Sequence, residues 1–171
     1  ALRQIEDGHK KALHRSAATP SQQSSSQGRN THPRIISMGG DHSVTLPILR
    51  SMASVHGPLS VIHFDSHLDT WKPKGSKGKD SAIAALNHWT YFYHASKEGL
   101  IRNGTSIHAG IRTTLYDIDD YKNDADCGFK LIEAWEIDTL GVKGIIDAIK
   151  ETVKDTPTYL SIDIDEIGRA S

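Results

Sequence analysis

The chain has 171 residues, 37% hydrophobic content and a formal net charge of -1, which is enough apolar material for one domain with a buried core. A nearly neutral chain has no positive field to hold nucleic-acid phosphates or an anionic membrane surface, so neither is expected as a partner. No apolar run approaches the ~20 residues that a membrane-spanning helix needs.

The first half of the chain predicts helix, loop, strand, helix and strand in turn. Residues 1–15 place apolar side chains at helical spacing, whereas 16–30 are rich in Ser and Gln and predict a flexible surface loop. The composition of 34–38 and 59–64 predicts two buried strands. Between these strands, a Gly-Gly turn leads into a helix that begins near Ser43.

The second half continues this alternation after a loop at 72–80, whose lysines are interpreted as solvated charge. The expected elements are a helix from about Thr90 to Leu100, a strand at 105–111, a short helix or loop at 116–128, a strand at 130–134, a helix at 139–153 and a final strand at 158–165. Strands that alternate with helices predict an α/β fold, in which helices cover both faces of a mainly parallel sheet.

Candidate metal ligands follow three of the expected strands. They are His42 in GGDHS, Asp65, His67 and Asp69 in DSHLD, and Asp163 and Asp165 in SIDID. Ligands gather beyond the carboxyl ends of parallel strands, and the every-second-residue spacing directs side chains to one side. Taken singly, such residues are often turn formers or helix caps. His63 shares the spacing but lies deeper, so we expect it to pack or to support the ligands.

Taken together, these residues favour a pair of divalent cations. Four carboxylates that converge on one crevice repel one another unless cations or protons neutralise them. A set of carboxylates and imidazoles without thiolates favours Mn²⁺ over structural Zn²⁺. Asp65 and Asp163 could bridge two ions about 3.5–4 Å apart, an arrangement that activates water for hydrolysis.

The three motifs, in this order between about Arg34 and Asp165, resemble the ureohydrolase family of arginases, agmatinases, guanidinobutyrases and formimidoylglutamases. GGDHS, LNHWTYFYHASKEGL and HAGIR look most like agmatinases, particularly fungal ones. The resemblance implies an arginase-like three-layer αβα fold, incomplete here, so that 1–171 form a single partial domain. It also implies hydrolysis of a small guanidino substrate, with agmatine giving putrescine and urea.

The resemblance further implies a role for each site residue. One manganese ion would be bound by His42, Asp65, Asp69 and Asp163, and the other by Asp65, His67, Asp163 and Asp165. Asp69 would also orient the hydroxide nucleophile. His88 in LNHWT would act beside the substrate as a proton shuttle or binding group, with a structural role as the alternative. Family members are usually trimers or hexamers, so a homo-oligomer is expected.

Two departures from the family pattern keep other readings open. Trp89 follows His88 where agmatinases usually have Gly, and the chain ends in EIGRAS where the family continues toward a substrate-binding Gly-Thr-Pro-Glu. One alternative is therefore a metal-binding remnant that lacks the C-terminal substrate-binding segment. Another is the same chemistry on arginine or guanidinobutyrate.

The cellular compartment is left open by the sequence. The single cysteine, Cys127, cannot form an internal disulfide, which fits a reducing compartment such as the cytoplasm. We interpret it as a small buried apolar side chain. The sequence begins with Ala1, so an N-terminal targeting segment would be missing from it.

Overall fold

The computed structural model describes residues 1–16, 32–73, 86–115 and 117–164. Within these residues, parallel strands form one sheet in the order β3-β2-β1-β4. The strands are β1 (Ser60–Phe64), β2 (Ser106–Ile111), β3 (Phe129–Glu133) and β4 (Thr158–Ile162). The prediction of an α/β fold around a parallel sheet is confirmed.

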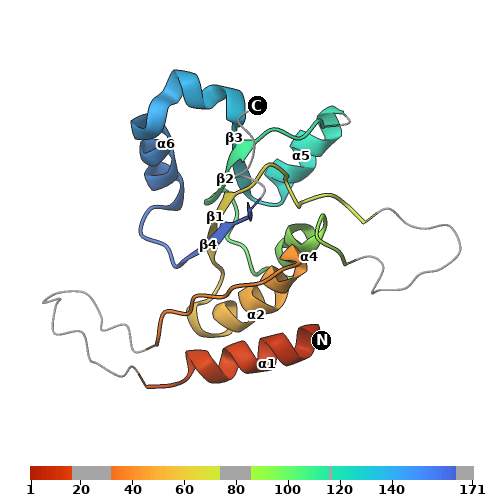
Figure 1. Ribbon diagram of the computed structural model, residues 1–171, viewed down its shortest axis with the longest axis vertical. Coiled ribbons are helices and arrows are strands. Elements are labelled where there is room, and N and C mark those ends of the chain that lie inside the picture. The colour runs from red at the N-terminus through yellow and green to blue at the C-terminus, as the bar shows by residue number, and fades with distance from the viewer. Residues whose placement is uncertain (17–31, 74–85, 116, 165–171) are drawn as a thin grey trace, which may run out of the picture.

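Helices cover both faces of this sheet (Figure 1). They are α1 (Leu2–Leu13), α2 (Thr45–His56), α4 (Tyr91–Lys97), α5 (Ile118–Asp126) and α6 (Ile137–Val153), with short 3-10 turns η1 (His42–Val44) and η2 (Ala134–Glu136). One face packs against α6 and the other against α2 and α4, and α1 lies outside α2 (Figure 1). No helix among the described residues is long and apolar enough to cross a bilayer.

Alternation along β1 divides the core into two apolar clusters. Val61 packs with α2 and α4, whereas Ile62 and Phe64 pack against α6 on the opposite face. Cys127 is buried in the first cluster, as predicted. Burial raises the pKa of its thiol to about 11, so the side chain behaves as a small apolar group.

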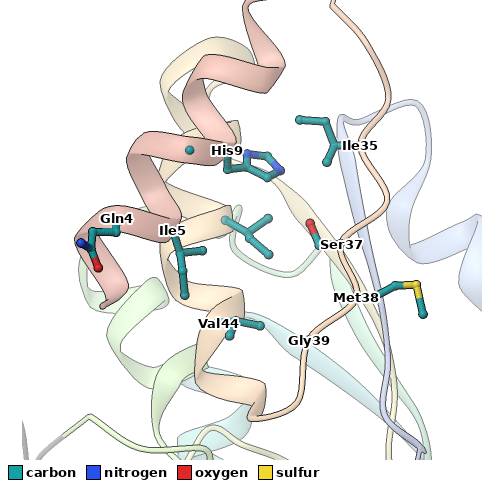
Figure 2. A pocket seen from close by; sticks show the side chains of 10 residues that line it. Gln4, Ile5, His9, Ile35, Ser37, Met38, Gly39 and Val44 are labelled. Carbon is teal, nitrogen blue, oxygen red and sulfur yellow. The ribbon is translucent and has the colours of Figure 1, made fainter.

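The predicted buried strand at 34–38 is wrong. Residues 33–39 run without regular secondary structure, and the side chains of Ile36 and Met38 are 92% and 97% exposed. A strand needs a neighbour for its backbone hydrogen bonds, but this segment lies beside α1 and the start of α2. Together these elements enclose an apolar pocket of about 410 Å³ (Figure 2).

Strand β4 lies at one edge of the sheet that the described residues form. Strand β4 is last in the sheet order, and its Leu160 and Ile162 side chains are 54% and 59% exposed. Residues 17–30 of the predicted flexible loop and 74–80 of the lysine-rich loop lie outside the described residues.

Candidate metal centre

Two neighbouring strands, β1 and the last strand β4, each deliver a carboxylate to the same end of the sheet. Strands β1 and β4 pair in parallel with Phe64 opposite Ile162. The backbone N–H of Asp163 donates to the Phe64 carbonyl at 2.9 Å, so Asp65 and Asp163 leave adjacent strands at the same level. Sheet topology alone therefore brings these two carboxylates together.

The imidazole of His42 lies at the centre of the carboxylates. Its Nδ1 is 3.3 Å from Asp65 Oδ2, 3.2 Å from Asp69 Oδ2 and 3.0 Å from Asp163 Oδ2. The opposite nitrogen, Nε2, lies 2.7 Å from the hydroxyl of Ser161 on β4. Because Ser161 fixes the ring from behind, Nδ1 is held facing the acidic groups.

These contacts move the pKa values of both partners in opposite directions. Burial lowers the pKa of His42, but the contacts with Asp65 and Asp69 outweigh burial and raise it to about 9. Burial likewise raises the pKa of Asp65, but contacts with His42, His63 and the His67 backbone N–H hold it well below its usual range. The site strongly favours positive charge beside ionised carboxylates.

A metal cation fits this arrangement. Nδ1 of His42 is buried, yet it forms no hydrogen bond of good geometry within the described part of the chain. Ligand atoms of His42, His63, Asp65 and Asp69 all lie within 4.8 Å of one another. The donors are imidazole nitrogens and carboxylate oxygens, whereas Cys127 is buried in an apolar cluster. Such a set suits a hard or borderline divalent ion.

Asp69 reaches the cluster from a constrained loop. Its backbone φ is +55°, a left-handed conformation that is uncommon for a residue with a side chain. Its carbonyl accepts from the Phe92 N–H at 3.1 Å, and the Trp71 N–H donates to the Trp89 carbonyl at 3.1 Å. The segment around the start of α4 therefore holds the ligand loop in place. The Trp89 side chain is half exposed.

Two of the remaining predicted site residues, His67 and His88, are more exposed than the residues of this cluster. The His67 Nδ1 is 3.3 Å from Asp65 Oδ1, and its side chain is 38% exposed. His88 is half exposed in the turn before α4, with Nδ1 3.7 Å from Asp41 Oδ2. Asp165 lies outside the described residues. The roles of His67, His88 and Asp165 stay predictions.

Comparison with known proteins gives the family of this chain. The model of the arginase family matches residues 1–170. The chain belongs to the arginase family. A Schizosaccharomyces pombe relative named "Putative agmatinase 1" is 53% identical over an alignment of 171 positions, which covers 99% of this chain and 43% of that protein. An agmatinase from Photorhabdus laumondii is 41% identical over 132 residues, or 77% of this chain and 38% of its own length.

Two solved structures share the fold of this chain. A hypothetical agmatinase from Burkholderia thailandensis matches with a TM-score of 0.68 and 31% identity, over 93% of this chain and 41% of its own. Proclavaminate amidino hydrolase from Streptomyces clavuligerus matches with a TM-score of 0.62 and 39% identity, over 74% of this chain and 39% of its own. The chain thus spans about two fifths of the length of these relatives.

In this arginase-family chain, two side chains lie beneath the cluster: His63, which the sequence analysis expected to pack or to support the ligands, and Tyr91, which it missed. His63 is fully buried with Nε2 3.0 Å from Asp65 Oδ2, and the Tyr91 hydroxyl lies 3.4 Å from the same nitrogen. Burial and the nearby carboxylates of Asp69 and Asp65 keep the pKa of Tyr91 well above its ordinary value, so it remains a hydrogen-bond donor. The spacing of His63 was a usable signal, whereas Tyr91 had none.

Proposed function

We propose that this chain provides the binuclear manganese centre of an agmatinase-type ureohydrolase, which cleaves agmatine to putrescine and urea. The convergence of His42 with Asp65, Asp69 and Asp163 carries the proposal, because a buried imidazole nitrogen faces three carboxylate oxygens at 3.0–3.3 Å. Relatives that bear the agmatinase name, at 40–53% identity, support this choice of substrate.

The proposed ligands divide between two ions. His42, Asp65, Asp69 and Asp163 would hold one ion, and Asp65, His67, Asp163 and Asp165 the other. A bound pair of such ions would supply positive charge and lower the pKa of water toward neutrality, which makes it a nucleophile for the guanidinium carbon. Asp65 and Asp163 would be shared by both ions, and their departure from adjacent strands supports this role.

The other side chains orient groups or move protons. The Asp69 carboxylate is held by its constrained loop and would accept a hydrogen bond from the attacking water. His88 and Asp41 lie together at the surface, and an exposed imidazole can exchange its proton with solvent. In our proposal His88 donates that proton to the amine that leaves as putrescine.

A second candidate function is cation binding without turnover. The chain covers about two fifths of the relatives' length, and the side chains of Leu160 and Ile162 on the last strand β4 are more than half exposed. Both observations favour a centre that binds ions and needs further protein to form the substrate pocket. Arginine and guanidinobutyrate are the alternative substrates if turnover occurs.

Urea release and metal stoichiometry, measured on the same purified protein, test the proposal. Urea formed from agmatine in preference to arginine and guanidinobutyrate, with two Mn²⁺ bound, is the expected result. Two ions without urea would favour the second candidate. Asp65→Ala and Asp163→Ala should each lose both ions, whereas Asp155→Ala, at an exposed position, should keep them. Full occupancy in either ligand variant refutes the bridging assignment.

A further inference from the structure

An exposed indole lies at the rim of the proposed centre. Trp89 belongs to the turn before α4, and its side chain is 53% exposed, whereas Tyr91 and Phe92 of α4 are fully buried. This segment therefore directs two rings into the core and leaves a third, larger ring in water. A single exposed ring can be ordinary protein surface, so its position decides whether it has a function.

Backbone hydrogen bonds fix the position of this turn against the loop of proposed metal ligands. The Trp71 N–H donates to the Trp89 carbonyl at 3.1 Å, and the Phe92 N–H donates to the carbonyl of the proposed ligand Asp69 at 3.1 Å. The side-chain oxygen of Asn87 accepts from the Trp89 N–H at 2.9 Å. Both backbone groups of Trp89 are therefore held, which fixes the point beside the centre from which its ring projects.

The Trp89 ring is one of three neighbouring side chains along this rim. The ring centroids of His88 and Trp89 are 4.8 Å apart, in an edge-to-face arrangement. His88 Nδ1 in turn lies 3.7 Å from Asp41 Oδ2, and Asp41 directly precedes the proposed ligand His42. The side chains of His88 and Asp41 are 51% and 60% exposed. All three side chains are therefore open to a molecule that arrives from solvent.

The proposed reaction directs the tail of the substrate along this rim. His88 donates a proton to the leaving nitrogen, and that nitrogen is the first atom of the aminobutyl tail of agmatine. The tail ends in an ammonium group, which lies about 6 Å from the leaving nitrogen when the chain is extended. The Trp89 ring, whose centroid is 4.8 Å from that of His88, is within reach of this group.

We propose that the Trp89 indole binds the ammonium group of agmatine, so that Trp89 selects a substrate with a cationic tail. The face of an indole is electron-rich and attracts an ammonium group that lies within about 6 Å of the ring centroid. Guanidinobutyrate ends in a carboxylate, which the same face repels. The inference rests on the proposed function, because it assumes that the guanidinium group is held at the metal centre.

Binding of the tail can be measured without turnover. Putrescine carries the same ammonium group and is not consumed, and 1,4-butanediol is its uncharged counterpart. In Mn²⁺-loaded protein, putrescine should change the tryptophan fluorescence until the site is saturated. The change should disappear in Trp89→Phe and persist in Trp135→Phe, which alters an exposed indole on η2. No change in wild-type protein, an undiminished change in Trp89→Phe, or an equal change with butanediol would overturn the inference.

Turnover of two matched substrates separates the ammonium contact from the apolar contact of the ring. Butylguanidine has the four-carbon chain of agmatine but lacks the ammonium group, and Trp89→Leu keeps an apolar side chain but removes the aromatic face. Loss of an exposed cation–π contact should raise KM for agmatine about three- to tenfold in Trp89→Leu. We expect no change in kcat or in KM for butylguanidine. Trp89→Phe should raise KM for agmatine less than Trp89→Leu does, and the control Trp135→Leu should leave it unchanged.

The kinetic outcomes that contradict this role of Trp89 are distinct. In variants with a native circular dichroism spectrum, an unchanged KM for agmatine in Trp89→Leu, or an equal rise for butylguanidine, would overturn the inference. A lower KM for agmatine in Trp89→Leu would also overturn it, because the ring would then obstruct the substrate. If wild-type protein releases urea from neither guanidine, the proposed function fails, and the putrescine titration still decides whether Trp89 binds an ammonium group.

Discussion

Binding of Mn²⁺ should compete with a proton on His42. The pKa of this imidazole is raised to about 9 by the surrounding carboxylates, so about 99% of it is protonated at pH 7 before a cation binds. Metal binding requires the neutral ring. Each pH unit below 9 should therefore weaken the apparent affinity about tenfold, or about 1.4 kcal/mol. Between pH 8.5 and 6.5 the loss should be about 100-fold.

Calorimetric titration with Mn²⁺ measures both the affinity and the released proton. At pH 7, titrations in buffers of different ionisation enthalpy should show about one proton released through His42. His42→Asn should abolish this share of the release, whereas His14→Asn, at an exposed position after α1, should retain it. An affinity that is flat from pH 6.5 to 8.5, or a release unchanged in His42→Asn, would refute the reasoning.

Three further predictions concern stability and reactivity. In chelator-treated protein, the raised pKa of His42 means that this residue stabilises the folded state fully below pH 6.5 and loses this effect as pH rises through about 9. Urea denaturation across that range should therefore show a midpoint that falls as pH rises. Gly128→Ala should destabilise the fold by about 2–3 kcal/mol, and the control Gly104→Ala by about 1–2 kcal/mol, because both glycines have a positive φ. The larger cost at 128 is expected because a Cβ there would lie 3.2 Å from the Asn103 backbone. Equal urea midpoints for the two variants would contradict this prediction. Cys127 should react with a disulfide reagent at least tenfold more slowly in native than in urea-unfolded protein, since burial raises its pKa to about 11; equal rates would count against its burial.

The sequence predicted the sheet well because its strands are short apolar runs with helices between them. The prediction of a strand at 34–38 was wrong for a physical reason. Ile36 has high strand propensity and Met38 is apolar, yet both side chains are exposed. The propensity of a segment does not say whether a neighbouring strand is present to pair with it. Convergence of Asp65 and Asp163 was predictable, since parallel strands end at one edge.

The details of the site were less accessible from sequence. The every-second-residue rule holds along β1 but not beyond its end, where Asp69 adopts a positive φ and His67 turns partly toward solvent. Asp124 stands in a polar helix with no motif around it. Its buried contacts with His108 and Thr70 are created by three-dimensional packing.

The His42 ring and the Ser161 hydroxyl that orients it are 119 positions apart along the chain. The cluster of His42 and the carboxylates therefore cannot assemble from any local segment. It forms when β4 docks beside β1, which closes a loop of most of the polypeptide. Closing such a loop costs conformational entropy before any ligand is in place. A bound cation would hold the two ends of this loop together, so metal binding should accompany the docking of β4 beside β1 during folding.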